Sequence, residues 1–273
     1  MNGKKHMAEY LFDSNRKIFE TIDKTDEVLL FLDYDGTLVY FKDHPNEVDN
    51  SYEVKTVLKR LIQNPKFTVF IVSGRPLHEI KNLMDIKGVS FAALHGLHIE
   101  CSDGRNFSWK PSEDGRFFLE KIKEKAFSEF NEEKGICIED KEFTLAFHYR
   151  MLPTKKTKYA TERFMKIVKR IDEKNMFEII KGAKVIEIRP KGWNKGKAIE
   201  LFLRNIDECE HAIPIYIGDD TTDEDAFAYL KNRGLTIFVS NDSKRSTSAQ
   251  YWLKNPDEVL VFLKSFLDIE TRF

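Results

Sequence analysis

The sequence has few cysteines and no long apolar run. Its 273 residues include three cysteines, Cys101, Cys137 and Cys209, without the C-x-x-C spacing. Such a sparse, odd set is more typical of reduced thiols in a cytoplasmic protein than of a disulfide framework. No apolar stretch approaches the ~20 residues that span a bilayer, and residues 1–25 lack the apolar core of a signal peptide. We therefore expect a cytoplasmic protein without a membrane partner.

The sequence also lacks an excess of either charge. It has 44 Lys and Arg residues against 45 Asp and Glu residues, which gives a formal net charge of -1. Because a nucleic-acid-binding protein usually carries a basic surface, this balance argues against a nucleic-acid partner. Hydrophobic residues make up 41% of the chain, enough for one elaborated domain or two.

Short apolar runs recur along the chain and are typical of buried strands. They cover residues 28–32, 67–72, 91–94, 213–217 and 235–239. Segments with helical periodicity accompany them over residues 54–61, 80–83, 199–203 and 227–230. This alternation predicts an α/β fold with a doubly wound, Rossmann-like parallel sheet. We also expect an amphipathic helix over 8–23, a loop over 39–50 that folds over the site, and a closing helix over 256–267.

The pattern changes in the middle of the chain. Charged helices alternate there with hairpins, over residues 114–132, 136–149, 155–174 and 177–188. This repeat predicts an antiparallel sheet covered by helices on one face. We therefore predict that residues 111–189 form an inserted α+β domain, and that residues 1–110 and 190–273 form the catalytic core domain.

Polar side chains gather where the parallel elements begin or end. The clusters are Asp33 with Asp35, Ser73, Lys195, and Asp219 with Asp223. Because the carboxyl ends of parallel strands share one edge of a sheet, we expect these clusters to meet. Carboxylate oxygens suit magnesium, and lysine and serine side chains can bind phosphate oxygens. The sequence therefore predicts a magnesium-assisted phosphoryl site.

These motifs resemble those of the haloacid dehalogenase superfamily of phosphatases. The matching pieces, in the superfamily's order, are Asp33-Tyr-Asp-Gly-Thr-Leu38, Ser73, Lys195-Gly196 and Gly218-Asp-Asp-Thr-Thr-Asp-Glu-Asp-Ala-Phe227. Within the superfamily, the chain most resembles the trehalose-6-phosphate phosphatases. Further pieces carry this resemblance: Ser73-Gly-Arg75, His95-Gly96, Glu139-x-Lys141, His148-Tyr-Arg150 and Glu187-x-Arg-Pro190. It extends over nearly the whole chain after residue 26 and implies a haloacid dehalogenase-type core with an inserted cap.

The resemblance also implies catalytic roles. Asp33 would be the nucleophile that forms an aspartyl-phosphate. Asp35 would protonate the departing sugar oxygen and then activate water. Ser73 and Lys195 would hold the phosphoryl group, and the cap would close on the sugar and exclude water.

Ligand-binding roles follow from the same resemblance. Asp33, the backbone carbonyl of Asp35 and Asp219 would hold Mg²⁺. Asp223 would act mainly through water or through Lys195. Contacts to the substrate are implied for Arg75, His95, Glu139, Lys141, Arg150 and Glu187.

Several of these signals also have simpler explanations. Asp-Gly is a common turn, the acids of 219–225 could cap a helix, and Lys195 could belong to a solvated face. Three pairs could be structural or solvated: His95 with His98, Glu139 with Lys141, and His148 with Arg150.

The resulting functional hypothesis is the magnesium-dependent hydrolysis of trehalose 6-phosphate. The alternatives are a phosphatase for another sugar phosphate, such as sucrose phosphate or a glycosylglycerate phosphate, and a sugar phosphomutase. A phosphate-receiver domain would give no role to Asp35, and an inactive binding module would not need the intact set of motifs. We expect a monomer, and functional association with a trehalose-phosphate synthase is a further hypothesis.

Overall fold

The structure is a computed structural model that describes residues 8–40, 52–182, 184–205 and 212–267. Most of the predicted loop over residues 39–50 lies outside the described residues. Cys209 also lies outside them. The chain divides into two compact units. One consists of residues 1–107 and 194–273, and the other of residues 108–193.

A nine-stranded sheet runs through the described part of the first unit, in the order β1-β13-β12-β11-β2-β3-β4-β5-β6. Pairing is parallel from β1 to β4 in this order, and β5 pairs antiparallel with β4. The strands are β1 Glu9–Tyr10, β2 Glu27–Asp33, β3 Phe67–Val72, β4 Ser90–Ala93, β5 His98–Glu100, β6 Asn106–Ser108, β11 Ala212–Gly218, β12 Leu235–Val239 and β13 Tyr251–Leu253. The inner strands are continuous apolar runs because both faces of a parallel sheet are covered.

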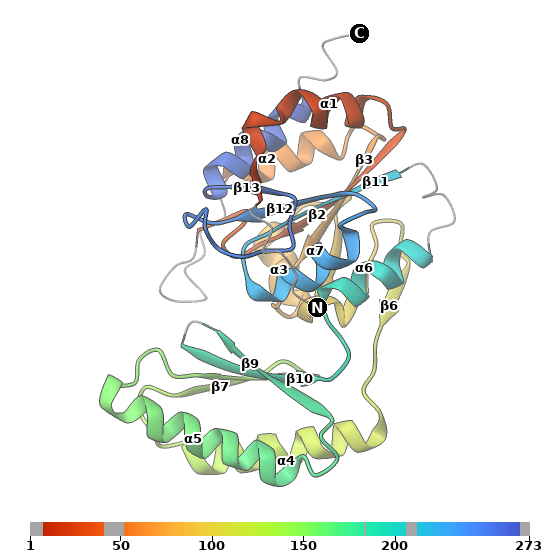
Figure 1. Ribbon diagram of the computed structural model, residues 1–273. Coiled ribbons are helices and arrows are strands. Elements are labelled where there is room, and N and C mark those ends of the chain that lie inside the picture. Colours follow the sequence, from red (N-terminus) through yellow and green to blue (C-terminus); the bar gives the residue numbers. More distant parts are fainter. Residues whose placement is uncertain (1–7, 41–51, 183, 206–211, 268–273) are drawn as a thin grey trace. The chain divides into compact units, whose positions relative to one another are not determined.

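Helices cover both faces of this sheet (Figure 1). They are α1 Asn15–Asp23, α2 Tyr52–Leu61, α3 Leu77–Met84, α6 Lys195–Arg204, α7 Glu224–Leu230 and α8 Pro256–Leu267. Leu30 and Val69 point to one face and join a core with buried side chains of α1, α2, α3 and α8. Their neighbours Phe31 and Phe70 point to the other face and pack against Phe202 of α6. No described helix is both long and apolar enough to cross a membrane.

The carboxyl end of β2 lies between those of β3 and β11. Asp33 is in register with Val72 of β3, and Leu32 with Ile217 of β11. The chain continues from β2 through β3 to β4 in one direction, and from β11 through β12 to β13 in the other. The strand order therefore reverses beside β2, and α/β sheets bind their ligands at such switch points.

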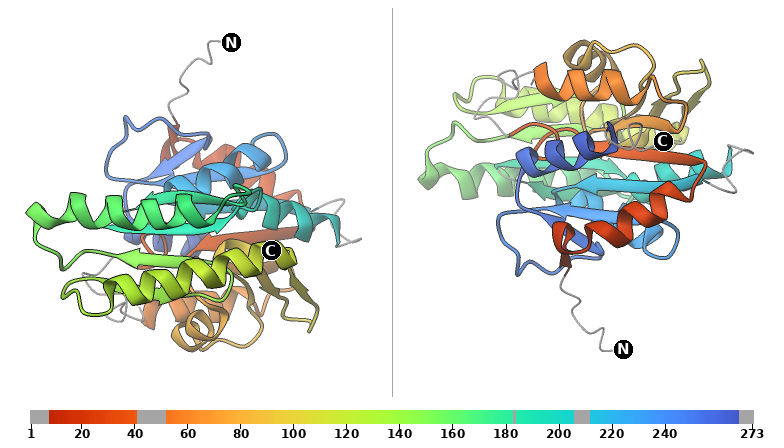
Figure 2. Two further views of the ribbon diagram at one scale, coloured as in Figure 1. Left: turned by 90° about the horizontal axis from the view of Figure 1, so that it is seen from below. Right: turned by 90° about the horizontal axis from the view of Figure 1, so that it is seen from above.

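The second unit contains a four-stranded antiparallel sheet in the order β7-β8-β10-β9. Its elements are α4 Glu113–Phe130, β7 Cys137–Asp140, β8 Leu145–His148, α5 Thr154–Ile171, β9 Phe177–Gly182 and β10 Val185–Pro190. Helices α4 and α5 lie side by side on one face of the sheet (Figures 1 and 2). Phe147 and Ile186 point to this face and pack with Phe164 of α5. The alternate residues of each strand point to the opposite face.

The predicted fold class is confirmed, because the structure has an α/β unit with a mostly parallel sheet and a separate antiparallel sheet with its own helices. The N-terminal helix, in contrast, was predicted too long. The expected helix over 8–23 begins only at Asn15, because Glu9 and Tyr10 pair in parallel with Tyr251 and Trp252 of β13. Pairing with a strand so distant in the sequence overrides the helical spacing. The short strands β5, β6 and β13 were not predicted, since each has only three residues and no distinct apolar run.

Candidate active site

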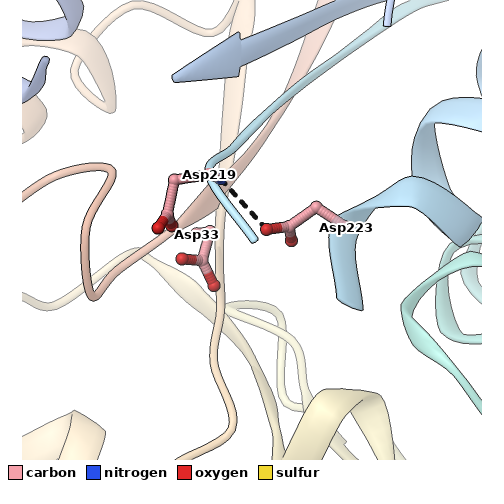
Figure 3. A group of neighbouring side chains, drawn as sticks. All are labelled: Asp33, Asp219 and Asp223. Carbon is pink, nitrogen blue, oxygen red and sulfur yellow. Dashed lines mark hydrogen bonds between the residues drawn. The ribbon is translucent and has the colours of Figure 1, made fainter. Parts of the chain in front are cut away.

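Three aspartates meet at the carboxyl end of β2. Asp33 is the last residue of β2, and Asp219 and Asp223 follow β11. One carboxylate oxygen from each lies within 4.8 Å of the others (Figure 3). Asp33 is 6% exposed and Asp223 is fully buried. Since buried carboxylates are costly without a cation or proton, this cluster requires compensation.

Lys195 supplies part of this compensation. It is the first residue of α6, which begins here because the Asn194 side chain accepts a hydrogen bond from the Lys197 backbone N–H. The Lys195 Nζ lies 2.6 Å from an oxygen of Asp33 and 2.6 Å from an oxygen of Asp223. Burial lowers the pKa of Lys195, but attraction to Asp223 and Asp33 outweighs it, and the pKa is raised. The lysine therefore remains charged.

Asp223 is held on both of its carboxylate oxygens. Oδ1 accepts hydrogen bonds from Lys195 and from the Tyr216 hydroxyl, each at 2.6 Å. Oδ2 accepts from the backbone N–H groups of Asp219 at 3.1 Å and Asp220 at 2.9 Å. Together the two oxygens of a carboxylate offer about four acceptor positions. The geometry therefore favours a role for Asp223 in positioning Lys195 and the 219–220 loop.

Two residues that the sequence did not single out hold Asp219. The Thr37 hydroxyl, fully buried, donates a hydrogen bond to Asp219 Oδ1 at 3.1 Å. Arg245 donates to the backbone carbonyl of Asp219 at 3.2 Å, and its guanidinium lies 4.6 Å from the Phe238 ring centroid. Thr37 lies within the Asp33–Leu38 motif, which could have indicated it. No sequence signal points to Tyr216 or Arg245.

The electrostatics of the trio fit a divalent cation. Burial, opposed by Lys195 and reinforced by the other two acids, raises the pKa of Asp33 well above its usual value. Burial and the charge of Asp223 raise the pKa of Asp219 to about 7. One lysine thus leaves negative charge uncompensated among hard oxygen donors, which is the environment that Mg²⁺ prefers. Asp33 and Asp219 would hold the ion, since the Asp223 oxygens are already engaged.

The raised pKa of Asp219 predicts how stability depends on pH. An aspartate whose folded-state pKa lies near 7 keeps its proton when the unfolded chain, with an ordinary value of 3.8, has lost it. The metal-free protein should therefore lose stability as the pH rises through this window. Mg²⁺ competes with that proton, so it should raise the melting temperature more at about pH 8 than at about pH 5.

Thermal unfolding in MgCl₂ and in EDTA measures this effect. In Asp219→Asn, the Mg²⁺-induced shift should largely disappear and the pH dependence of the metal-free protein should weaken, with the raised pKa of Asp33 accounting for what remains. An equal Mg²⁺ shift at both pH values, retained in Asp219→Asn, would contradict this description of the site.

Asp35 lies outside the aspartate trio and is bound by Arg75. Arg75 Nε lies 2.7 Å from Asp35 Oδ2 and Nη2 lies 2.8 Å from Oδ1, which is a bidentate pair. Arg75 also contacts Glu79. The residue to which the resemblance gave a substrate contact therefore orients the predicted acid and base in this structure.

Ser73 and His95 lie in two neighbouring loops, Ser73 directly after β3 and His95 just after β4. Ser73 is buried, its hydroxyl accepts from the Arg75 backbone N–H at 3.1 Å, and its carbonyl accepts from the His95 N–H at 2.9 Å. The His95 ring lies directly against Gly74, where a Cβ would be 2.8 Å from the ring atoms. This packing favours a supporting role for His95, which has a positive φ of 56°.

Gly218 is essential to this geometry because Asp223 packs against it. A Cβ at Gly218 would lie 2.3 Å from Asp223 Cγ. Gly218→Ala should therefore displace the Asp223 carboxylate and, with it, Lys195. Misplacement of about 1 Å can cost roughly 10²-fold in rate, so we expect a loss of kcat of that order.

Steady-state kinetics on Gly218→Ala check this expectation. Near-normal turnover by Gly218→Ala would show that the position of Asp223 is not critical.

The other predicted side chains lie in the second unit. Glu139, Ala146 and Glu187 form a cross-strand row on the sheet face opposite the helices. Lys141 Nζ lies 3.8 Å from the Oε2 atoms of both Glu139 and Glu187. His148 Nε2 lies 2.8 Å from Glu139 Oε2.

These charges form a mutually supporting cluster. Burial raises the pKa of Glu139, but His148 and Lys141 outweigh it, and the pKa is lowered. Glu139 is therefore ionised. Arg150, the last predicted substrate contact, is exposed just after β8.

Comparisons with known proteins place this geometry in a family. Residues 31–257 match the family model described as trehalose-phosphatase. Trehalose-phosphate phosphatase B of Arabidopsis thaliana is 31% identical over 274 residues, covering 94% of this chain and 71% of the relative. Probable trehalose-phosphate phosphatase D of the same plant is 32% identical, covering 92% and 71%.

Solved structures agree with this match. The C-terminal domain of the Candida albicans trehalose-6-phosphate phosphatase shares the fold, with a TM-score of 0.81 at 24% identity over 96% of this chain and 98% of that one. The Aspergillus fumigatus trehalose-6-phosphate phosphatase has a TM-score of 0.64 at 27% identity, covering 94% and 98%. The chain therefore belongs to the trehalose-phosphatase family, phosphoric monoester hydrolases of the haloacid dehalogenase fold.

Proposed function

We propose that this protein is a Mg²⁺-dependent phosphatase that hydrolyses trehalose 6-phosphate to trehalose and phosphate through an aspartyl-phosphate on Asp33. The observation that carries the proposal is the buried arrangement of Asp33, Lys195 and Asp223 at the end of β2, with Nζ–O distances of 2.6 Å. The proposal is supported by membership of the trehalose-phosphatase family.

In the first step, a carboxylate oxygen of Asp33 attacks phosphorus, and the bond from phosphorus to the sugar oxygen breaks. Asp35, oriented by Arg75, gives a proton to the departing sugar oxygen. Lys195 and Ser73 bind the phosphoryl oxygens and stabilise their charge as the bond breaks.

In the second step, water replaces the carboxylate of Asp33. Asp35 takes a proton from this water, whose oxygen attacks phosphorus, and the bond to Asp33 breaks to release phosphate. Mg²⁺, held by Asp33 and Asp219 and, by analogy, the backbone carbonyl of Asp35, would offset the negative charge of the phosphoryl oxygens. Asp223 keeps Lys195 in place throughout.

Recognition of the sugar is assigned to the unit of residues 108–193, acting as a cap. Glu139, Lys141 and Glu187 offer closely spaced donors and acceptors on a sheet face, which suits a disaccharide with many hydroxyls and little apolar surface. Arg150 is assigned a supplementary contact. The relatives' names favour trehalose 6-phosphate over sucrose phosphate or a glycosylglycerate phosphate.

Further properties belong to the same proposal. We infer a monomeric, cytoplasmic enzyme of trehalose biosynthesis, without nucleic-acid or membrane partners and functionally associated with a trehalose-phosphate synthase. The near-neutral charge balance supports the absence of a nucleic-acid partner. The free thiols of Cys101 and Cys137 support a reducing compartment.

Phosphate release across a panel of sugar phosphates tests the substrate assignment. We expect rapid release from trehalose 6-phosphate in MgCl₂, little in EDTA, and far less from sucrose phosphate and glycosylglycerate phosphate. Release without an added bisphosphate argues against a phosphomutase. Faster turnover of another sugar phosphate than of trehalose 6-phosphate would overturn the assignment.

A further inference from the structure

Lys123 is a buried charge in the second unit. It lies on α4, it is 5% exposed, and its Nζ has an acceptor for each of its three N–H groups. These are Glu120 Oε1 at 2.9 Å, Asp140 Oδ1 at 2.7 Å and the Glu142 carbonyl oxygen at 3.2 Å. Burying a lysine is costly, and a leucine or methionine would cover this core without that cost. The arrangement therefore calls for a reason beyond packing.

Two of the three acceptors belong to the turn between β7 and β8. Asp140 Oδ1 accepts from Lys123 and also from the backbone N–H of Glu142 at 2.9 Å. The backbone of Glu142 is in the left-handed region, with a φ of 68°. This conformation costs energy for a residue other than glycine. Lys123 thus holds the turn on both sides of residue 141.

Lys141 stands between these two anchor points. Its backbone N–H bonds to the Thr144 carbonyl at 3.1 Å, and its carbonyl accepts from Phe143 at 2.8 Å. Its Nζ then lies 3.8 Å from Oε2 of Glu139 and 3.8 Å from Oε2 of Glu187. At that distance the lysine forms an ion pair with each of the two acids.

We propose that Lys123 is a positioning residue for sugar selectivity: by fixing the turn of residues 140–142, it places Lys141 between Glu139 and Glu187. The proposal rests on the proposed function, in which these three residues bind the sugar. Lys123 lies on α4, on the helix-covered side of the sheet, so it acts on the sugar only through Lys141.

Kinetics of Lys123→Met provide the first test. The variant keeps an unbranched side chain that is one atom shorter, and it removes the charge and the three N–H donors. The KM for trehalose 6-phosphate should rise ~10-fold, about the value of one charged hydrogen bond, with kcat changed by less than ~2-fold. The KM for p-nitrophenyl phosphate, which has no sugar, should not change. Lys121→Met, at an exposed lysine on the same helix, is the matched control and should behave as wild type.

A double-mutant cycle separates positioning from general loosening. Lys141→Met alone should raise the KM for trehalose 6-phosphate, and adding Lys123→Met should raise it no further. Amide hydrogen exchange should be faster over residues 140–144 in Lys123→Met and unchanged in the β9–β10 hairpin. If Lys123→Met does not fold, Asp140→Asn removes the charge of the partner and should give the same pattern.

Three results would overturn the proposal: unchanged exchange over 140–144, faster exchange with an unchanged KM, or KM effects that multiply in the double variant. The proposed function fails separately, if the wild type does not hydrolyse trehalose 6-phosphate. The hydrogen-exchange measurement then still decides whether Lys123 holds the turn. The double-mutant cycle, repeated with the sugar phosphate that is hydrolysed fastest, decides whether Lys123 affects sugar binding through Lys141.

Discussion

Asp33→Asn should abolish phosphate release, with a loss of roughly 10⁴-fold or more in kcat, as is usual when a covalent nucleophile is removed. An amide cannot form the aspartyl-phosphate that the proposed mechanism requires. The fold should survive the change, because Lys195 keeps its bond of 2.6 Å to Asp223. Burial raises the pKa of Asp33 and so disfavours its charge in the metal-free protein. The melting temperature of Asp33→Asn in EDTA should therefore be equal to or higher than that of the wild-type protein in EDTA.

Phosphate release and thermal unfolding of the same preparation test both parts of this expectation. Asp26→Asn, at an exposed aspartate just before β2, is a matched control and should keep full activity. If Asp33→Asn were folded and still turned over trehalose 6-phosphate at a rate near that of the wild type, a covalent mechanism through Asp33 would be excluded.

Asp35→Asn should lower kcat/KM for trehalose 6-phosphate by about 10²–10⁴-fold, the usual contribution of a general acid. The sugar oxygen is a poor leaving group, so its departure depends on the proton from Asp35. The p-nitrophenolate ion leaves without such help, and kcat/KM for p-nitrophenyl phosphate should therefore fall much less. This contrast separates acid catalysis from a general disturbance of the site.

Kinetics with the two substrates measure this contrast. Asn at position 35 has one oxygen for the two N–H groups that Arg75 now donates, so a displaced Arg75 is the main competing explanation. Glu79→Gln, which removes the other acid bound to Arg75, controls for it and should affect both substrates alike. Equal losses on the two substrates in Asp35→Asn would argue against Asp35 as the acid.

The central sheet and the meeting of the aspartates could be predicted from the sequence because both follow from local patterns. The apolar runs ending at Asp33 and Gly218 are continuous, and parallel strands with short links leave little choice of topology. Once β2 and β11 are neighbours, Asp33 and Asp219 must share one edge. The same reasoning brings Lys195 there, because it is the first residue of α6, the helix before β11, and a helix between parallel strands starts at the edge where the strands end.

The residues that hold the functional side chains in place could not be predicted, because their contacts form only when distant parts of the chain pack together. Tyr216 lies in an apolar strand and reads as a core aromatic, yet its hydroxyl bonds to Asp223. Arg245 follows β12 and reaches Asp219 across 26 residues. Lys123 resembles the exposed lysines around it on α4 until the turn of β7 and β8 is in place. In each case the strand or helix was foreseeable and the partner was not.

The most direct test of the proposed function is to trap the intermediate. Wild-type protein is mixed with trehalose 6-phosphate carrying a radiolabelled phosphoryl group in MgCl₂, quenched in acid within the first turnover, and digested. We expect label on the peptide that contains Asp33, and conversion of that residue to homoserine by borohydride. A burst of free phosphate with no label on the protein, or label on another residue, would contradict it.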